Sequence, residues 1–355
     1  MFSCKPDYEA AQKRIDAFWN HDDTDRPLTL INYRKPNHKP FPDKEYNNWR
    51  DKWLDFDYIA EETAHSMDGI VFFADSMPVF HPNLGPEIIS AMAGCPYHFS
   101  ETTTWTDPCV RDWAADGPKA VISMDSEYFK LLDKFTRVML DAAKGKFIVG
   151  LSDFHPGGDH IAALRDPQVL AEDMYDNREY VIEKLKSSYP EYFAVYDHFV
   201  DLLKSHNMPI ASWITLTSDT SMYIPSNDFS CMISKDMFDD VFLGGLIEEC
   251  RHYKKSVYHL DGPDALRHLD SLLAIKELNA IQWVPGAGNE QVVPWIGVFK
   301  KILSAKKSVI AYPGNREELD LLIENLPARG LCVQMWAKDE AEAEDIMRVI
   351  ERWGK

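Results

Sequence analysis

Short apolar runs alternate with longer helix-like segments almost from one end of this 355-residue chain to the other. The runs are continuously apolar rather than alternating in polarity, which is typical of parallel strands covered by helices on both faces. They are found at 27–33, 69–75, 147–153, 209–215, 228–233, 256–262, 278–285, 308–314 and 330–336. About eight strand–helix units in one uninterrupted series predict an α/β fold of the (β/α)8 TIM-barrel type.

No linker rich in Gly, Ser or Pro divides this series, so the sequence predicts a single domain that spans residues 1–355. An open doubly wound sheet is the alternative, but no glycine-rich nucleotide-binding motif follows any of the runs. Residues 76–117 break the alternation with the polar stretch YHFSETTTWTDP. This break predicts a hairpin or lid inserted into the barrel.

Several of the intervening segments begin with residues that favour helix N-termini. Asp166 precedes a proline, and Ser234 precedes a segment with apolar residues at helical spacing. Asn315 and Asp339 each precede acidic residues, which suit the positive end of the helix dipole. The sequence therefore predicts helices over 166–187 and 234–254, and two more that open at 315 and 339.

The chain is strongly acidic, with 57 Asp and Glu residues against 38 Lys and Arg and a formal charge of −19. Such a surface repels phosphate backbones and anionic lipids, so a small-molecule substrate is expected rather than nucleic acid or a membrane. No apolar run approaches the roughly 20 residues needed to cross a bilayer, and the first residues lack a signal-peptide pattern. The six cysteines form no CxxC pair. A cytoplasmic protein is expected.

Polar residues stand at the ends of several expected strands, where TIM barrels place their chemistry. His259 and Asp261 end one strand, and their spacing of two puts both side chains on one side of the sheet. Together they could bind a divalent metal, or the carboxylate could orient the imidazole as a general base. Alternatively, they bond each other and cap the next helix. His268, on that following helix, is expected to be solvated or to cap it.

Other strand ends supply further candidates. Asp153 and His155, from the loop DFHPGGDH, join His259 and Asp261 as candidate catalytic groups. Cys231 is a candidate metal ligand, although a cysteine is more often a small buried hydrophobe. The candidates for contact with a substrate are Asp75, Trp213, Asp228, Gln282, Trp283 and Trp336.

With these residues placed, the chain resembles the uroporphyrinogen decarboxylase superfamily of single-domain (β/α)8 barrels. The resemblance spans nearly the whole sequence and is strongest over 83–94, 101–105, 147–176, 228–238, 256–275 and 280–288. True uroporphyrinogen decarboxylases carry an arginine-rich N-terminal motif that grips the carboxylates of the porphyrin. The matching region here, LINYRKPNHKPF, has Arg34 as its only arginine, which argues against a porphyrin substrate.

The resemblance is nearer to the second branch of the superfamily, the corrinoid-linked methyltransferases. Their zinc site resembles His-x-Cys on one strand with a cysteine from a later strand. His259 matches the histidine, Asp261 occupies the cysteine position, and no cysteine stands near Trp336. The thiol-rich zinc site is therefore not reproduced, which leaves a site richer in oxygen and nitrogen, completed by one further ligand; zinc still fits such a site, as does no metal at all. The candidates for that ligand are Asp153, His155, Asp228 and Cys231. The resemblance also implies a corrinoid carried by a partner protein, and a homodimer.

Three hypotheses follow for the function. The leading one is a methyltransferase that moves a methyl group between a small substrate and a separate corrinoid protein, with a metal at His259 and Asp261 as Lewis acid. The second is a metal-independent decarboxylase or lyase in which Asp75 or Asp153 stabilises a cationic intermediate. The third is a non-catalytic barrel that binds an apolar or sugar-like ligand at an aromatic-lined mouth.

Overall fold

A computed structural model describes residues 2–353, whose strands form one seven-stranded sheet and two small sheets. The large sheet runs in the order β2 (Ile70–Ala74), β1 (Leu28–Arg34), β11 (Leu331–Trp336), β10 (Ser308–Ala311), β9 (Ala280–Val284), β8 (Lys255–Asp261) and β7 (Met222–Tyr223). Neighbouring strands of this sheet pair in parallel, except that β1 and β2 are antiparallel. The chain thus has a mixed α/β fold with a parallel sheet.

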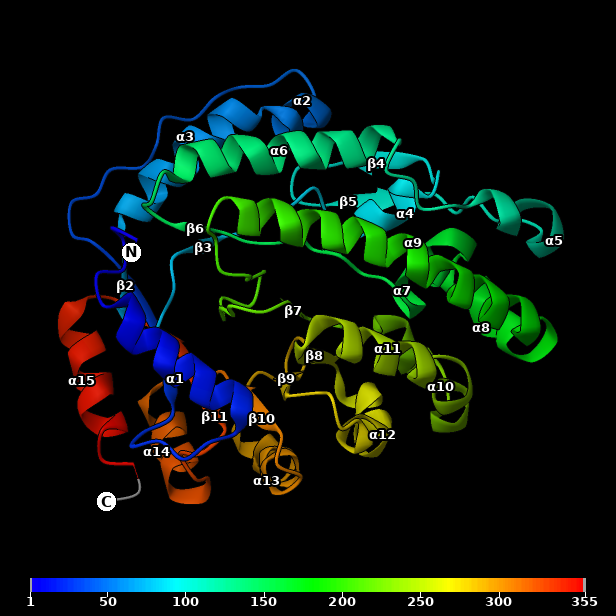
Figure 1. The fold of residues 1–355 in the computed structure, drawn as a ribbon. Coiled ribbons are helices and arrows are strands. Elements are labelled where there is room, and N and C mark those ends of the chain that lie inside the picture. Colours follow the sequence, from blue (N-terminus) through cyan, green and yellow to red (C-terminus); the bar gives the residue numbers. More distant parts are fainter. Residues whose placement is uncertain (1, 354–355) are drawn as a thin grey trace.

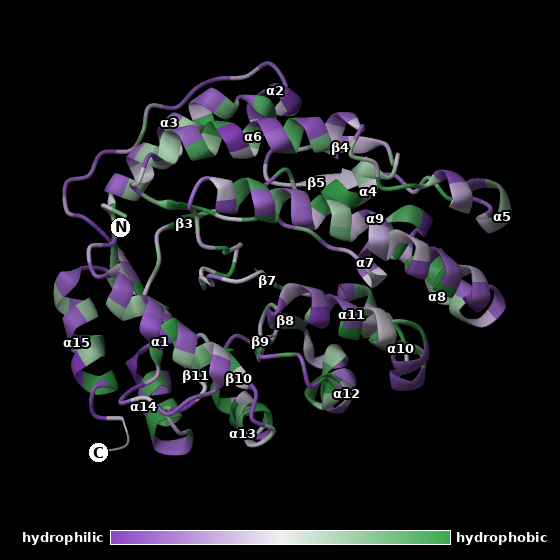
Figure 2. Ribbon diagram, viewed as in Figure 1, coloured by the Kyte–Doolittle hydropathy of each residue, from purple (hydrophilic) through white to green (hydrophobic). Residues whose placement is uncertain are grey.

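Helices cover the outside of the strands (Figure 1). They include α3 (Phe56–Asp68), α6 (Glu127–Ala143), α9 (Arg178–Ser205), α11 (Leu243–Tyr253), α12 (Leu269–Ala274), α13 (Ile296–Ser304), α14 (Arg316–Asn325) and α15 (Glu340–Ile350). Each buries apolar residues, and Figure 2 shows hydrophobic and hydrophilic residues alternating around the helices. Residues of β10 are buried on both faces, as the continuous apolar runs predict.

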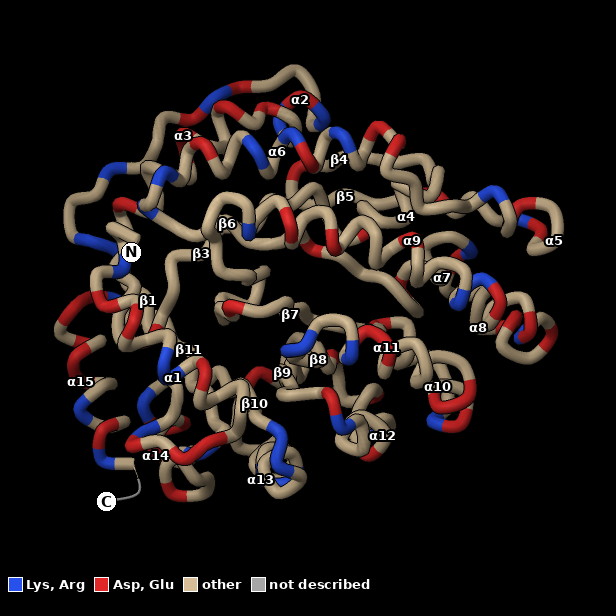
Figure 3. The backbone as a smooth tube through the Cα atoms, viewed as in Figure 1, with Lys and Arg blue, Asp and Glu red and all other residues tan. Residues whose placement is uncertain are grey.

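The outer surface mixes charges of both signs. Figure 3 shows acidic and basic residues interspersed along the outer helices rather than gathered by sign. Among residues 2–353, none of the helices combines the length and the apolar character that crossing a bilayer requires.

Helix α1 (Tyr8–Asn20) covers the amino ends of the parallel strands. The Asn279 side chain just before β9 donates to the Trp19 carbonyl at 3.0 Å, and Ser308 at the start of β10 donates to that of Phe18 at 2.7 Å. Lys255, the first residue of β8, donates to the Asn20 side chain at 2.7 Å. These contacts close one end of the sheet and leave the carboxyl ends as the place for a site.

The remaining strands continue the series without joining the large sheet. β3 (Val79–Phe80) pairs in parallel with β6 (Ile148–Val149), and the amide of Leu151 donates to the carbonyl of Ala211 at 2.7 Å. Within residues 2–353 the strand ladders fall into separate sheets. A closed barrel therefore stays a prediction.

Two expected strands are replaced by other structure. Residues 228–233 form a 3₁₀ helix, Asp228–Met232, because the Ser230 amide bonds the Asn227 carbonyl and turns the chain. In 209–215 only Ile210 makes a β-bridge, with Ser218. The strand next to β8 is instead the short β7, which the apolar runs did not indicate.

The expected helix starts are confirmed, but two expected helices are divided. Side chains of Asp166, Ser234, Asn315 and Asp339 each accept a bond from an amide in the following turn. The segment 166–187 comprises α8 (Pro167–Asp176) and the start of α9. The segment 234–254 comprises α10 (Lys235–Val241) and α11.

A hairpin interrupts the series within residues 76–117, as the sequence predicts. β4 (Tyr97–Phe99) pairs antiparallel with β5 (Thr104–Thr106), between α4 (Ile88–Met92) and α5 (Trp113–Asp116). The Glu87 carboxylate accepts a 2.7 Å bond from the Thr106 hydroxyl, which ties the hairpin to the residue before α4. A further short helix, α2 (Trp49–Leu54), precedes α3.

Candidate active site

His259 and Asp261 lie on the same face at the end of β8, as their spacing predicts. Asp228, from the neighbouring 3₁₀ helix, joins them. One potential ligand atom of each residue lies within 4.8 Å of the others, and all three side chains are at least partly accessible. The sequence analysis named four candidates for a third ligand, and the structure places one of them, Asp228, beside His259 and Asp261.

The orientation of the His259 ring is fixed from behind. Gln282 stands opposite it in the β8–β9 register, and its Oε1 lies 2.7 Å from His259 Nδ1. An amide oxygen only accepts, so Nδ1 carries the proton and Nε2 presents a lone pair. Gln282 is held in turn, because its Nε2 donates to the Tyr312 hydroxyl at 2.6 Å. The Trp213 ring meets His259 edge to face, with centroids 5.2 Å apart.

The carboxylates of this group face one another rather than a cation. Burial and the nearby charge of Asp159 raise the pKa of Asp228 to about 6, and Asp261 adds to the effect. Among residues 2–353, neither Asp228 nor Asp261 forms an ion pair with a lysine or arginine. Like charges at this spacing repel each other, and a bound cation would relieve the repulsion.

His155 lies between two other carboxylates. Its Nε2 is 2.9 Å from Asp153 Oδ1 and its Nδ1 is 2.8 Å from the Ser226 oxygen, while Ser226 donates to Asp159 Oδ2 at 2.9 Å. Burial opposes a charge on the ring, but the bond to Asp153 and the negative charge of Asp159, 3.7 Å from Nδ1, raise the pKa of His155 well above its usual value. Every hydrogen bond in this network has a donor and an acceptor when both nitrogens of the His155 ring carry a proton.

Glycines let the loop of His155 fold back against the 3₁₀ helix. Gly157 has φ of 68°, a left-handed conformation that favours glycine. A Cβ on Gly158 would lie 2.3 Å from the side chain of Asn227. α7 (Gly158–Arg165) then begins, and Asp159 in its first turn accepts a 3.0 Å bond from the Phe229 amide. The loop and the helix that carries Asp228 are thus held together.

A cavity of about 450 Å³ adjoins this group. His155, Asp159 and Asp228 lie on one side of it, and Glu87, Thr106 and Pro108 on the side of the β4–β5 hairpin. The volume is in the range of small-ligand pockets. Asp228 belongs both to this wall and to the group with His259, so a molecule in the cavity would lie beside that group.

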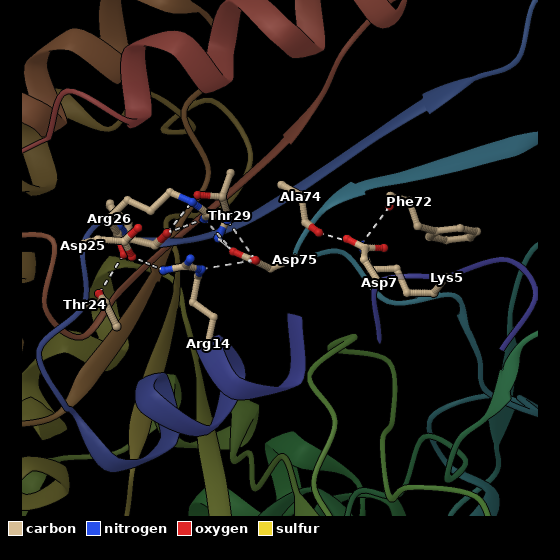
Figure 4. A network of polar contacts seen from close by, with 11 residues as sticks. Lys5, Asp7, Arg14, Thr24, Asp25, Arg26, Thr29, Phe72, Ala74 and Asp75 are labelled. Atoms are coloured by element: carbon tan, nitrogen blue, oxygen red, sulfur yellow. Dashed lines mark hydrogen bonds and ion pairs between the residues drawn. The ribbon is translucent and has the colours of Figure 1, made fainter. Parts of the chain in front are cut away.

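Asp75 does not lie with these residues, because β2 is antiparallel to β1. Its strand therefore ends beside Thr29, near the amino end of β1. Arg26 binds both carboxylate oxygens at 2.6 and 2.9 Å, and the Thr29 amide donates at 2.9 Å. Figure 4 shows Asp75 held within this network, with Arg14 also 3.3 Å away. The expected substrate contact at Asp75 is replaced by a structural ion pair.

Three other expectations are corrected. Trp283 neighbours Gln282 in the strand and so points to the opposite face, where it packs on Trp295 with only 1% of its surface exposed. Cys231 is exposed and is not one of the three grouped ligands. His268 is fully buried, with Nε2 2.9 Å from the Ser230 carbonyl, because the 3₁₀ helix of Asp228 covers it.

Trp336 is exposed at the end of β11, where its register partner is Asn32 of β1. Gln282 contacts His259 and Tyr312, so it positions the imidazole, a role that differs from the expected substrate contact. Sequence reasoning missed Ser226 and Tyr312, and it left Asp159 out of its candidate set. Tyr312 directly follows β10, so the rule of strand ends would have found it. Ser226 gave no such signal.

Comparisons with known proteins give a fold and no family. No protein-family model matches the chain, and no curated protein matches it. Among solved structures it is similar to a methyltransferase from Methanosarcina mazei, with a TM-score of 0.59. The match covers 96% of this chain and 98% of that one at 8% sequence identity. A likeness over nearly the full length of both chains establishes that they share an overall fold.

Proposed function

We propose that the chain is a (β/α)8-barrel methyltransferase that moves a methyl group between a small substrate and a separate corrinoid protein. A divalent metal, with zinc as the leading candidate, would be held by Asp228, His259 and Asp261. The observation that carries the proposal is the grouping of these three ligand atoms within 4.8 Å beside a cavity. A fold shared with a methyltransferase and the resemblance to corrinoid-linked methyltransferases support it.

The donor set fits a metal. One imidazole nitrogen and two carboxylates suit zinc and other divalent ions of intermediate hardness. The Gln282 amide oxygen accepts a hydrogen bond from Nδ1–H of His259, and a contact of this kind orients a histidine that binds a metal. Three protein ligands leave coordination positions open, as catalytic sites require. When bound, the metal would act as a Lewis acid that lowers the pKa of a coordinated substrate group.

The surrounding residues have separate parts in this proposal. Trp213 lies against His259 and limits access of water from that side. His155 lies on the cavity wall, where Asp153 and Ser226 engage its two ring nitrogens, so it holds this part of the wall in one arrangement.

Metal content tests the site directly. The purified protein is expected to bind close to one equivalent of zinc after chelator treatment and titration, and His259→Ala is expected to lose it. His206→Ala is the matched control, because His206 is exposed directly after α9 and bonds only that helix and its neighbour Ser205. Equal zinc binding by wild type and His259→Ala would contradict the site.

Turnover tests the reaction. Free methylcobalamin with a panel of small thiols, and reduced cobalamin with methoxylated compounds, are followed by the change in the corrinoid absorption spectrum. A rate that depends on both the protein and zinc is expected. Zinc binding without any methyl transfer across the panel would favour a hydrolase or lyase at the same site.

A further inference from the structure

Two cysteines face each other at the base of the β4–β5 hairpin. The Sγ atoms of Cys95 and Cys109 are 3.0 Å apart, although the residues lie on either side of the hairpin. Cys95 is buried and Cys109 is partly exposed. Their sulfurs need to approach by only about 1 Å to reach the length of a disulfide bond.

The backbone on each side of the pair is held in place. The Cys95 amide donates to the Ser90 carbonyl of α4, and the Val110 amide after Cys109 donates to the Leu164 carbonyl of α7. The Asp107 amide also donates to the Pro96 carbonyl at 2.9 Å, which directly links the segment after Cys95 to the segment before Cys109. The two sulfurs are therefore presented to each other by the fold.

The pair also has the polarity that thiol exchange requires. Cys95 donates its S–H to Cys109, and this bond lowers the pKa of the Cys109 thiol against the effect of burial, with help from Lys184. The thiolate is the nucleophile in exchange, so the partly exposed Cys109 is the attacking group and the buried Cys95 the resolving one.

We propose that Cys95 and Cys109 form a reversible disulfide, a redox-sensitive modification site independent of the metal group. The Cys109 thiolate attacks a low-molecular-weight disulfide and releases one thiolate. Cys95 then loses its proton and attacks the Cys109 sulfur of the mixed disulfide, releasing the second thiol. The added disulfide takes up the two electrons, and both protein thiols lose their protons.

The bond would act next to the cavity. Thr106 and Pro108 line it, and Cys109 directly follows Pro108. On the other side Cys95 Sγ lies 3.9 Å from the carbonyl of Ala163, another lining residue. Oxidation would fix the base of the hairpin beside the wall that faces His155 and Asp228.

The test equilibrates the full chain with glutathione buffers of graded redox potential, traps free thiols with N-ethylmaleimide and maps the peptides. One Cys95–Cys109 disulfide is expected, with the other four cysteines alkylated and full reversal by dithiothreitol. Stable glutathione on Cys109 without this bond would overturn the proposal. Alkylation of Cys95 and Cys109 to the same extent as the exposed Cys231 in every buffer, including the most oxidising one, would also overturn it.

A second readout is thermal unfolding. Closing a loop of about 15 residues is expected to raise the thermal midpoint by roughly 4 °C on oxidation. Cys109→Ser is expected to lose this rise, and Cys231→Ser is the matched control that keeps it. An oxidation-dependent rise of the same size in Cys109→Ser would overturn the proposal. If that variant does not fold, the peptide map of the wild type decides alone.

Discussion

Asp75 and the Asp228–Asp261 pair are carboxylates in two regions of the same fold with opposite surroundings. Asp75 is buried near the amino end of β1, and Arg26, Arg14 and the Thr29 amide all face its oxygens. Asp228 and Asp261, by the end of β8, face each other and His259. A buried charge whose partners are supplied by the chain serves stability, whereas grouped carboxylates without a cation favour a bound ligand.

Removal of the compensated carboxylate is expected to have the largest effect. Asp75→Ala leaves Arg26 buried without its partner, so the free energy of unfolding should fall by about 3–5 kcal/mol. Urea unfolding measures this. Asp25→Ala is the control, since Asp25 pairs with Arg14 at the surface and should cost at most about 1 kcal/mol. Similar losses of unfolding free energy in Asp75→Ala and Asp25→Ala would contradict the structural role assigned to Asp75.

Removal of an uncompensated carboxylate should act on ligand binding instead. Asp261→Asn is expected to lower zinc affinity by at least about 100-fold, because even partners behind the ligands contribute 10- to 100-fold. The stability of the metal-free protein should stay the same or rise, since the variant loses a repulsion. Asp264→Asn, on a neighbouring exposed acid, is the control in calorimetric titration. Destabilisation as large as that of Asp75→Ala would contradict this assignment.

A further carboxylate, the buried Glu249, avoids both arrangements by holding a proton. Burial raises its pKa from 4.5 to about 8, although the Tyr189 and Tyr253 hydroxyls donate to it. A group whose pKa is raised on folding stabilises below its unfolded pKa and loses that contribution as pH rises to the folded value. Unfolding free energy should therefore fall between pH 4.5 and 8 by up to roughly 1.4 kcal/mol per pH unit from this group. Glu249→Gln should flatten this slope, and an unchanged slope in urea titrations would contradict the assignment.

The smallest expected effect belongs to the residue behind His259. Gln282→Ala removes the acceptor of the Nδ1 proton and should lower zinc affinity by roughly 10-fold. Tyr312→Phe is the matched variant, because it keeps the Gln282 amide in place but removes the hydroxyl that the amide contacts. Its loss should be smaller. The reverse order in zinc titrations would assign the orientation of His259 to Tyr312.

The sequence predicted the parts of the fold that depend on local pattern. Continuous apolar runs correctly indicated a parallel sheet, and the helix caps were found from single residues such as Ser234. The pairing of His259 with Asp261 followed from the period of a strand. The direction of each strand could not be predicted from the sequence. Because β2 is antiparallel to β1, Asp75 lies at the opposite end of the sheet from the one expected. Asp228 reaches the pair through a 3₁₀ turn that an apolar segment does not signal.

The cover that α1 forms over the amino ends has a consequence for synthesis. The helix leaves the ribosome before the strands that it covers, because Phe18 and Ser308 are 290 residues apart and Trp19 and Thr217 are 198 apart. At about 5–20 residues per second, roughly 15 to 60 s pass between translation of Phe18 and that of Ser308. Throughout that interval the nascent helix lacks its contact with Ser308, and for about two thirds of it the contact with Thr217 as well. A chaperone that binds α1 until β10 has been synthesised would therefore protect the helix before it docks.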